Sequence, residues 1–149
     1  MSHPAQREVT AVAASVAKQL SGTDHAVDVT LSAVAPLEEG FPPRSPLLHL
    51  ARTVAHPATV TTVRPLKPPH RWPSHLQQTL ESIAAHPGKA EATPGAPSIA
   101  ATVEHHLGTV RMAAEAVVTE PGDYASTWRR DFVLVTATHI ALLTVTIDD

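Results

Sequence analysis

Hydrophobic residues recur at helical spacing in three parts of the chain. In residues 4–20 they fall three or four positions apart, after a proline that suits the first turn of a helix. A shorter pattern at 47–55 follows Ser45, a favourable cap, and Pro46, which suits the first helical position. Residues 74–88 begin with a serine and a glutamine at capping-box spacing and end in glycine. The sequence therefore predicts about three helices.

Alternating hydrophobic and polar positions indicate a strand at 26–34, and β-branched residues indicate a second strand at 58–64. From residue 98 onward the whole pattern favours strands. Segments 98–107 and 110–118 flank Gly108, which suits the turn of a hairpin. The alanines of 110–118 leave a helix as an open alternative for that segment.

The longest apolar run extends from Phe132 to Ile147. It is far longer than a usual strand of about 5 or 6 residues, so we expect a hairpin with its corner at 136–139. Both faces of each arm are largely apolar, which predicts burial on both faces. Three helices supply cover for one face, so a loop, a curled sheet or another subunit must cover the second.

A length of 149 residues is typical of one domain. We expect a single α+β domain, with about three helices packed on a mainly antiparallel sheet that ends in a C-terminal β-hairpin or meander. Residues 1–86 form a mixed helix and strand half, 87–97 a loop rich in Pro and Gly, and 98–149 an antiparallel β half. The proline-rich segment 65–73 is either a rigid connector whose Trp72 folds back onto the core or a docking surface.

Charge and composition exclude several classes of function. The net charge is -3, and the basic residues are scattered except for Arg129 and Arg130, so nucleic acid is not an expected partner. The chain has no cysteine, and hence no disulfide or thiolate metal site. It shows no secretory signal and no apolar run long enough for a membrane span, so we expect a cytoplasmic protein with no membrane partner.

Ten histidines are the main candidates for chemistry, because histidine transfers protons near neutral pH. In the expected strand, Glu104 and His106 point to one face, where the carboxylate orients the ring as a catalytic base. His70, Arg71 and His75 lie beside a helix start, where they suit a small anion. The competing interpretation is that all five are ordinary surface residues. No three ligands have metal-binding spacing, so we expect no metal site and no cofactor.

The sequence contains no nucleophile elbow, phosphate-binding loop or zinc-protease motif, which favours a protein that is not an enzyme. The predicted function is non-enzymatic binding or assembly, in which the protein associates with itself or with another protein through the apolar terminal hairpin. Trp128, Arg129, Leu142 and Val145 are the candidate interface residues. The alternative is a small-ligand-binding protein or a cofactor-independent acid/base enzyme with a histidine-centred pocket.

Overall fold

A computed structural model of the chain describes residues 3–20, 26–83, 95–119 and 128–148. Within these ranges it forms a single α+β domain of four α-helices and a five-stranded antiparallel sheet. The helices are α1 (Pro4–Leu20), α2 (Leu47–Ala55), α3 (Trp72–Ile83) and α4 (Ala96–Leu107), with a 3-10 turn η1 (Pro69–Arg71) before α3. The strands are β1 (Ala26–Pro36), β2 (Thr59–Pro65), β3 (Met112–Thr119), β4 (Trp128–Val135) and β5 (His139–Asp148).

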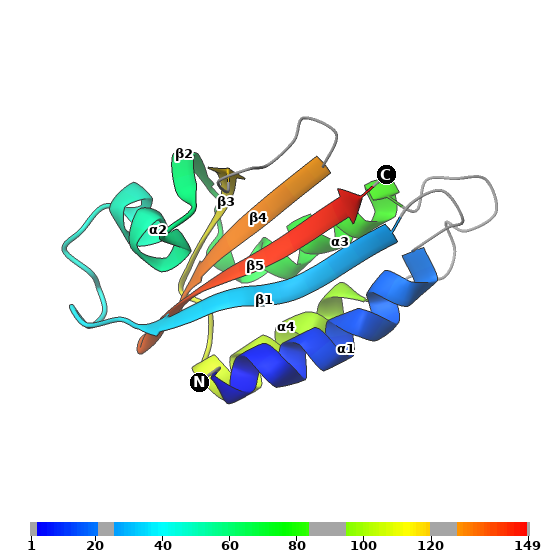
Figure 1. The fold of residues 1–149 in the computed structure, drawn as a ribbon. Helices are drawn as coiled ribbons and strands as arrows, with labels where there is room; N and C mark the ends of the chain where they lie inside the picture. The colour runs from blue at the N-terminus through cyan, green and yellow to red at the C-terminus, as the bar shows by residue number, and fades with distance from the viewer. Residues whose placement is uncertain (1–2, 21–25, 84–94, 120–127, 149) are drawn as a thin grey trace.

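The C-terminal hairpin of β4 and β5 lies inside the sheet, whose strand order is β1-β5-β4-β3-β2 (Figure 1). All neighbouring strands are antiparallel. Val135 pairs with Ile140, and the Thr136 N–H donates to the His139 carbonyl at 2.9 Å. The hairpin and its corner at 136–139 are therefore confirmed.

Both faces of the hairpin are buried, as the apolar pattern predicts. Every residue of 132–135 and 140–145 is at most 6% exposed. Phe132 and Leu134 enter a core shared with α1, α3 and α4, whereas Val133 and Val135 enter a second core shared with α2. Figure 1 shows α2 near the hairpin corner, and α1 and α4 on the opposite side of the sheet from α2. The chain itself thus supplies a cover for each face.

The α2 helix covers only the half of its sheet face that is nearest the hairpin corner. Its core takes side chains from the end of β4 and the beginning of β5. Farther from the corner the same face carries polar side chains. In β1, Val27, Val29 and Leu31 point to the three-helix core, so Asp28 and Thr30 between them point to the face that α2 covers. Hydroxyl groups of Ser32 and Thr144 meet here at 2.8 Å. The buried polar side chains of this half-face, which we call the polar half-face, need hydrogen-bonding partners.

The expected strand at 98–107 is wrong, because these residues form α4. Ile99, Val103 and Leu107 are four positions apart and at most 3% exposed, which is the spacing of a helix face. Gly108 follows the end of this helix with φ 93°, a conformation that glycine adopts without strain. It therefore ends a helix and does not form the turn of a hairpin. The segment 110–118 belongs to β3, which settles the alternative left open for it in favour of a strand.

Two helix starts also differ from the expectation. The α3 helix begins at Trp72, so Ser74 lies inside it and is not a capping residue. Trp72 is 1% exposed, so the tryptophan of the proline-rich segment folds back onto the core as expected, while a docking role for the segment stays a prediction. The residue that precedes α2 is Pro46 rather than Ser45, and no side chain caps that helix. Residues 84–94, which include most of the expected loop at 87–97, lie outside the described ranges.

Both edge strands of the sheet are shielded from further strand pairing. On β1, the side-chain amide of Gln6 donates to the carbonyls of Leu31 and Ser32, each at 3.4 Å. On β2, the Arg52 Nε donates to the Val60 carbonyl at 3.0 Å. Each edge strand also has an irregular register and ends in a proline. These features discourage edge-to-edge association.

Truncating the hairpin core should be far more costly than truncating an exposed strand residue. Phe132→Ala removes a fully buried ring and should lower the free energy of unfolding by about 3–5 kcal/mol. Val117→Ala changes a side chain that is 56% exposed and should cost less than about 1 kcal/mol. Urea denaturation of both variants measures the difference, and equal losses would contradict the assignment of Phe132 to the core.

Candidate functional site

A buried carboxylate organises the polar half-face of the sheet. Asp131 of β4 is 0% exposed. Its Oδ2 accepts from the Arg129 Nε at 2.7 Å and its Oδ1 from the Arg129 Nη2 at 3.1 Å, which is a bidentate ion pair. The Thr144 hydroxyl donates to the same Oδ1 at 2.6 Å, and the hydroxyl group of Ser32 lies 2.8 Å from that of Thr144. The network joins β1, β5 and β4.

The network exists because the strand register brings these residues together. Asp131 lies directly opposite Thr144, and Thr144 lies opposite β1 near Ser32. A buried charge is costly without partners, and here the carboxylate has an arginine and a hydroxyl donor. Within the described ranges, every buried side-chain nitrogen or oxygen has a hydrogen-bond partner. Asp131 is therefore a structural group that holds Arg129 in place.

Arg130, the next residue of β4, points to the other face of the sheet. Its guanidinium stacks over the Trp128 ring at 5.3 Å from the ring centre. It also donates to the Thr79 hydroxyl of α3 at 3.4 Å. Stacking on a tryptophan face and a hydrogen bond to α3 restrain this cation without neutralising its charge.

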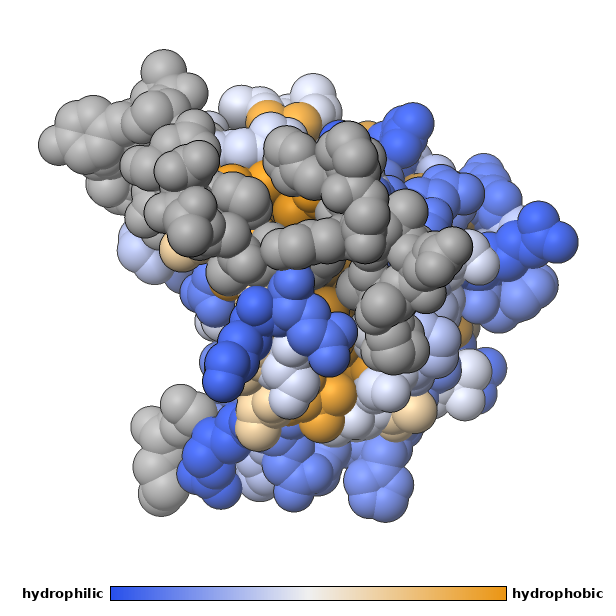
Figure 2. Space-filling model, turned by 90° about the vertical axis from the view of Figure 1, so that its right-hand side faces the viewer, coloured by the Kyte–Doolittle hydropathy of each residue, from blue (hydrophilic) through white to orange (hydrophobic). Residues whose placement is uncertain are grey.

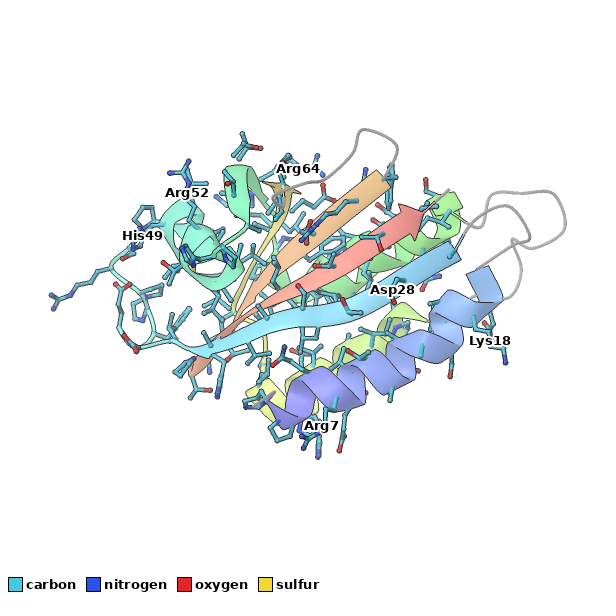
Figure 3. The ribbon with its side chains drawn as sticks, in the orientation of Figure 1. Arg7, Lys18, Asp28, His49, Arg52 and Arg64 are labelled. Atoms are coloured by element: carbon cyan, nitrogen blue, oxygen red, sulfur yellow. The ribbon has the colours of Figure 1, made fainter. Side chains whose placement is uncertain are left out.

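Beside these residues lies a cleft of about 440 Å³ that spans the β2, β3 and β4 side of the sheet. We call it the arginine cleft. It is lined by Thr62, Val63, Arg64, Glu115, Ala116, Val117, Val118, Arg129 and Arg130. Three of the nine residues that line the cleft are arginines and one is acidic, so positive charge predominates there. Figure 3 labels Arg64 at the β2 side.

The floor of the arginine cleft combines an exposed ion pair with an exposed apolar side chain. Arg64 of β2 pairs with Glu115 of β3 at 2.6 Å, and the Arg64 side chain is 71% exposed. Val117, two residues along β3 on the same face, is 56% exposed. An exposed valine between arginines offers a partner both an apolar contact and charge-assisted hydrogen bonds.

Glu104 and His106 were expected to point to the same face of a strand. They lie on the helix α4 instead, and each has a different hydrogen-bond partner. The Glu104 carboxylate accepts from the Val110 N–H at 2.8 Å and so braces the turn after α4. The His106 Nε2 lies 2.7 Å from a carboxylate oxygen of Glu8 on α1. This hydrogen bond and the charge of His106 lower the pKa of Glu8. Each candidate therefore has a packing role between α4 and its neighbours.

The predicted anion site at the start of α3 stays a prediction. His70 and Arg71 are exposed residues of η1, and His75 is half-buried in the first turn of α3. The His75 carbonyl accepts from the Thr79 hydroxyl at 3.0 Å, which is a contact within the helix. No described contact joins the three side chains to one another.

The four predicted interface residues are divided between the core and the cleft. Leu142 and Val145 are 3% and 0% exposed, in the second and the first core respectively, and so offer no surface to a partner. Trp128 packs half-buried against the three-helix core, and Arg129 lines the arginine cleft. Self-association stays a prediction, and an interface in this fold must use surfaces other than Leu142 and Val145.

The view in Figure 2 is consistent with this division. It looks at the molecule from the right-hand side of Figure 1, and hydrophobic residues appear there in separate small areas between hydrophilic ones. On the described part of this face, no broad apolar surface is visible. Apart from Val117, the exposed large hydrophobic residue of the described ranges is Phe41 at 37%.

The hairpin corner contains a pair of histidines that sequence reasoning did not single out. The rings of His3 and His139 meet edge to face with their centres 5.2 Å apart. The Thr138 hydroxyl lies 2.8 Å from the His139 Nδ1. Burial, and secondarily the charge of His3, lower the pKa of His139. The signal for the contact is absent from the sequence, because 136 residues separate the two rings.

Comparison of the chain with protein-family models, with curated proteins and with solved structures found no match. No α-helix of the described residues is long and apolar enough to cross a membrane. In the same ranges, no three histidine or acidic side chains are grouped as a metal ion requires.

Removing the buried carboxylate should destabilise the protein more than removing an exposed one. Asp131→Ala leaves the Arg129 guanidinium and the Thr144 hydroxyl without this acceptor in a buried site, at a cost of about 3–5 kcal/mol. Glu115→Ala breaks the exposed pair with Arg64 and should cost at most about 1 kcal/mol. Chemical denaturation compares the two variants, and a mild effect of Asp131→Ala would contradict a structural role for the network.

Stability should fall as pH drops through the histidine range, partly because of His139. A histidine whose folded-state pKa is below the ordinary 6.5 binds more protons when unfolded, so stability is lost as pH falls below that value. His139→Gln should flatten the slope of unfolding free energy between about pH 7 and pH 5. His56→Gln, at an exposed position, is the control, and an unchanged slope in the His139 variant would refute this origin of the pH dependence.

Proposed function

We propose that the protein is a non-enzymatic binding protein that docks an acidic segment of a partner protein in the arginine cleft. The observation that carries this proposal is that the exposed Arg64, Arg130 and the exposed Val117 line one cleft, with Arg129 lining it from the other face of the sheet. Even with the charges of Glu115 and Asp131 counted against them, the three arginines leave a net positive charge. Carboxylates are the side chains that arginine binds best through paired hydrogen bonds.

The composition of the cleft supports a protein partner. Arginine is enriched among the residues that dominate binding energy in protein interfaces. Arg130 is already held over Trp128 and near Thr79, and Arg129 is held by Asp131. Cations that are ordered before binding lose less conformational entropy when a partner arrives.

The shielded sheet edges favour side-chain recognition over strand addition. The Arg52 side chain donates a hydrogen bond to the Val60 carbonyl on β2, the edge strand next to the cleft. The register of β2 is also irregular between Val60 and Thr62. A partner segment would therefore lie across the cleft and contact Arg64, Val117 and Arg130 through its side chains. The acid/base alternative has weaker support, because Glu104 and His106 have separate structural partners.

Fluorescence anisotropy with labelled peptides tests the proposal. One probe alternates glutamate with leucine, and the other alternates lysine with leucine. The acidic probe should bind at least about tenfold more tightly, and Arg130→Gln or Arg64→Gln should weaken it about tenfold, since a charge-assisted hydrogen bond contributes about 1.5–3 kcal/mol. Added salt should weaken binding in the same direction.

Arg7→Gln is the matched control, because Arg7 is exposed on α1, away from the cleft, as Figure 3 shows. This variant should bind the acidic probe as the parent protein does. Equal affinity for both probes, or equal losses in the Arg7 and Arg130 variants, would show that the attraction is not localised in the cleft and would overturn the proposal.

A further inference from the structure

A second cleft, at the C-terminal end of β2, has a different character. It occupies about 500 Å³ between the beginning of α2, the segment that connects β2 to η1, and the beginning of β3. We call it the Met112 cleft. It is lined by Leu47, Pro65, Leu66, Lys67, Pro69, Arg111, Met112 and Ala113. Six of these eight residues are apolar, the other two are cations, and none is acidic.

Backbone hydrogen bonds form this cleft without a ligand. The Leu66 N–H donates to the Ala113 carbonyl at 2.8 Å, which holds the connecting segment against the start of β3. The Arg111 N–H donates to the Val135 carbonyl at 2.7 Å, which anchors the other side to β4. Leu66 and Ala113 are 4% and 3% exposed, so the floor is part of the core. A volume of this size is typical of a small-molecule site.

Apolar side chains line the interior of the cleft and two cations lie at its rim. Leu47 and Met112 are half-buried, and the flexible thioether of methionine adapts to ligands of different shape. Lys67 and Arg111 are exposed. The Arg111 guanidinium lies 5.6 Å from the centre of the Phe41 ring, which holds it near the cleft.

This combination selects one ligand chemistry. An apolar wall binds a hydrocarbon chain, and two cations without an acidic neighbour among the lining residues bind a single anionic head group. We propose that the Met112 cleft binds a small amphipathic carboxylate, with its chain against Leu47, Leu66 and Met112 and its head group at Lys67 and Arg111. This site is independent of the arginine cleft, with which it shares no lining residue.

The chain offers a direct probe, because Met1 and Met112 are its two methionines. In protein labelled with carbon-13 in the methionine methyl groups, the signal that disappears in Met112→Leu belongs to the cleft. Titration with decanoate up to about 10 mM should move this Met112 signal saturably. Decylammonium, with the same chain and the opposite charge, should bind at least about tenfold more weakly.

The charge requirement is tested by substitutions at the rim. Lys67→Gln and Arg111→Gln should each weaken decanoate binding about tenfold. Lys18→Gln and Arg7→Gln change exposed cations of the same types on α1, as Figure 3 shows, and should leave binding unchanged. An unmoved Met112 signal would overturn the proposal. Equal binding of decanoate and decylammonium would also overturn it, as would equal effects of the rim and control variants.

Discussion

Burial of the β4–β5 hairpin on both faces is the constraint on which the rest of the fold depends. A side chain such as Phe132 or Leu142 contributes about 1.5–3 kcal/mol when it leaves water, so neither face can remain open. Three helices cover one face and α2 covers the corner half of the other. The part of that face farther from the corner is stabilised by a different interaction, the buried ion pair and hydroxyl chain around Asp131.

The two clefts follow from the same arrangement. The α2 helix and the β2–β3 pair form the side of the sheet farthest from α1, and β2 is paired on one side only. One cleft opens between β2, β3 and β4 and is rich in arginine, while the other opens beneath the beginning of α2 and is mainly apolar. None of the buried hairpin residues 132–135 and 140–145 lines either cleft. The proposed functions therefore place recognition at the rim of the sheet and stability at its centre.

The sequence predicts the hairpin, its corner and the helices α1, α2 and α3. Each of these depends on local periodicity or on a long apolar run. The strand β3 could also be predicted, with a helix left open as the alternative, since apolar positions 110 to 118 alternate with Thr109, Arg111 and Glu115. The α4 helix was not predicted because the β-branched residues of 98–107 and the glycine that follows also fit a strand and a hairpin turn. The clefts depend on register and on contacts between distant segments, as with Arg64 and Glu115, so local patterns carry no signal for them.

Native-state hydrogen exchange at two protein concentrations, about tenfold apart, tests most directly whether the chain itself buries its central hairpin. We expect the backbone amides of Phe132–Val135 and Ile140–Val145 to exchange most slowly in the protein, at the free energy of global unfolding and with equal protection at both concentrations. Protection of these amides that rises with concentration would show instead that another subunit covers the hairpin.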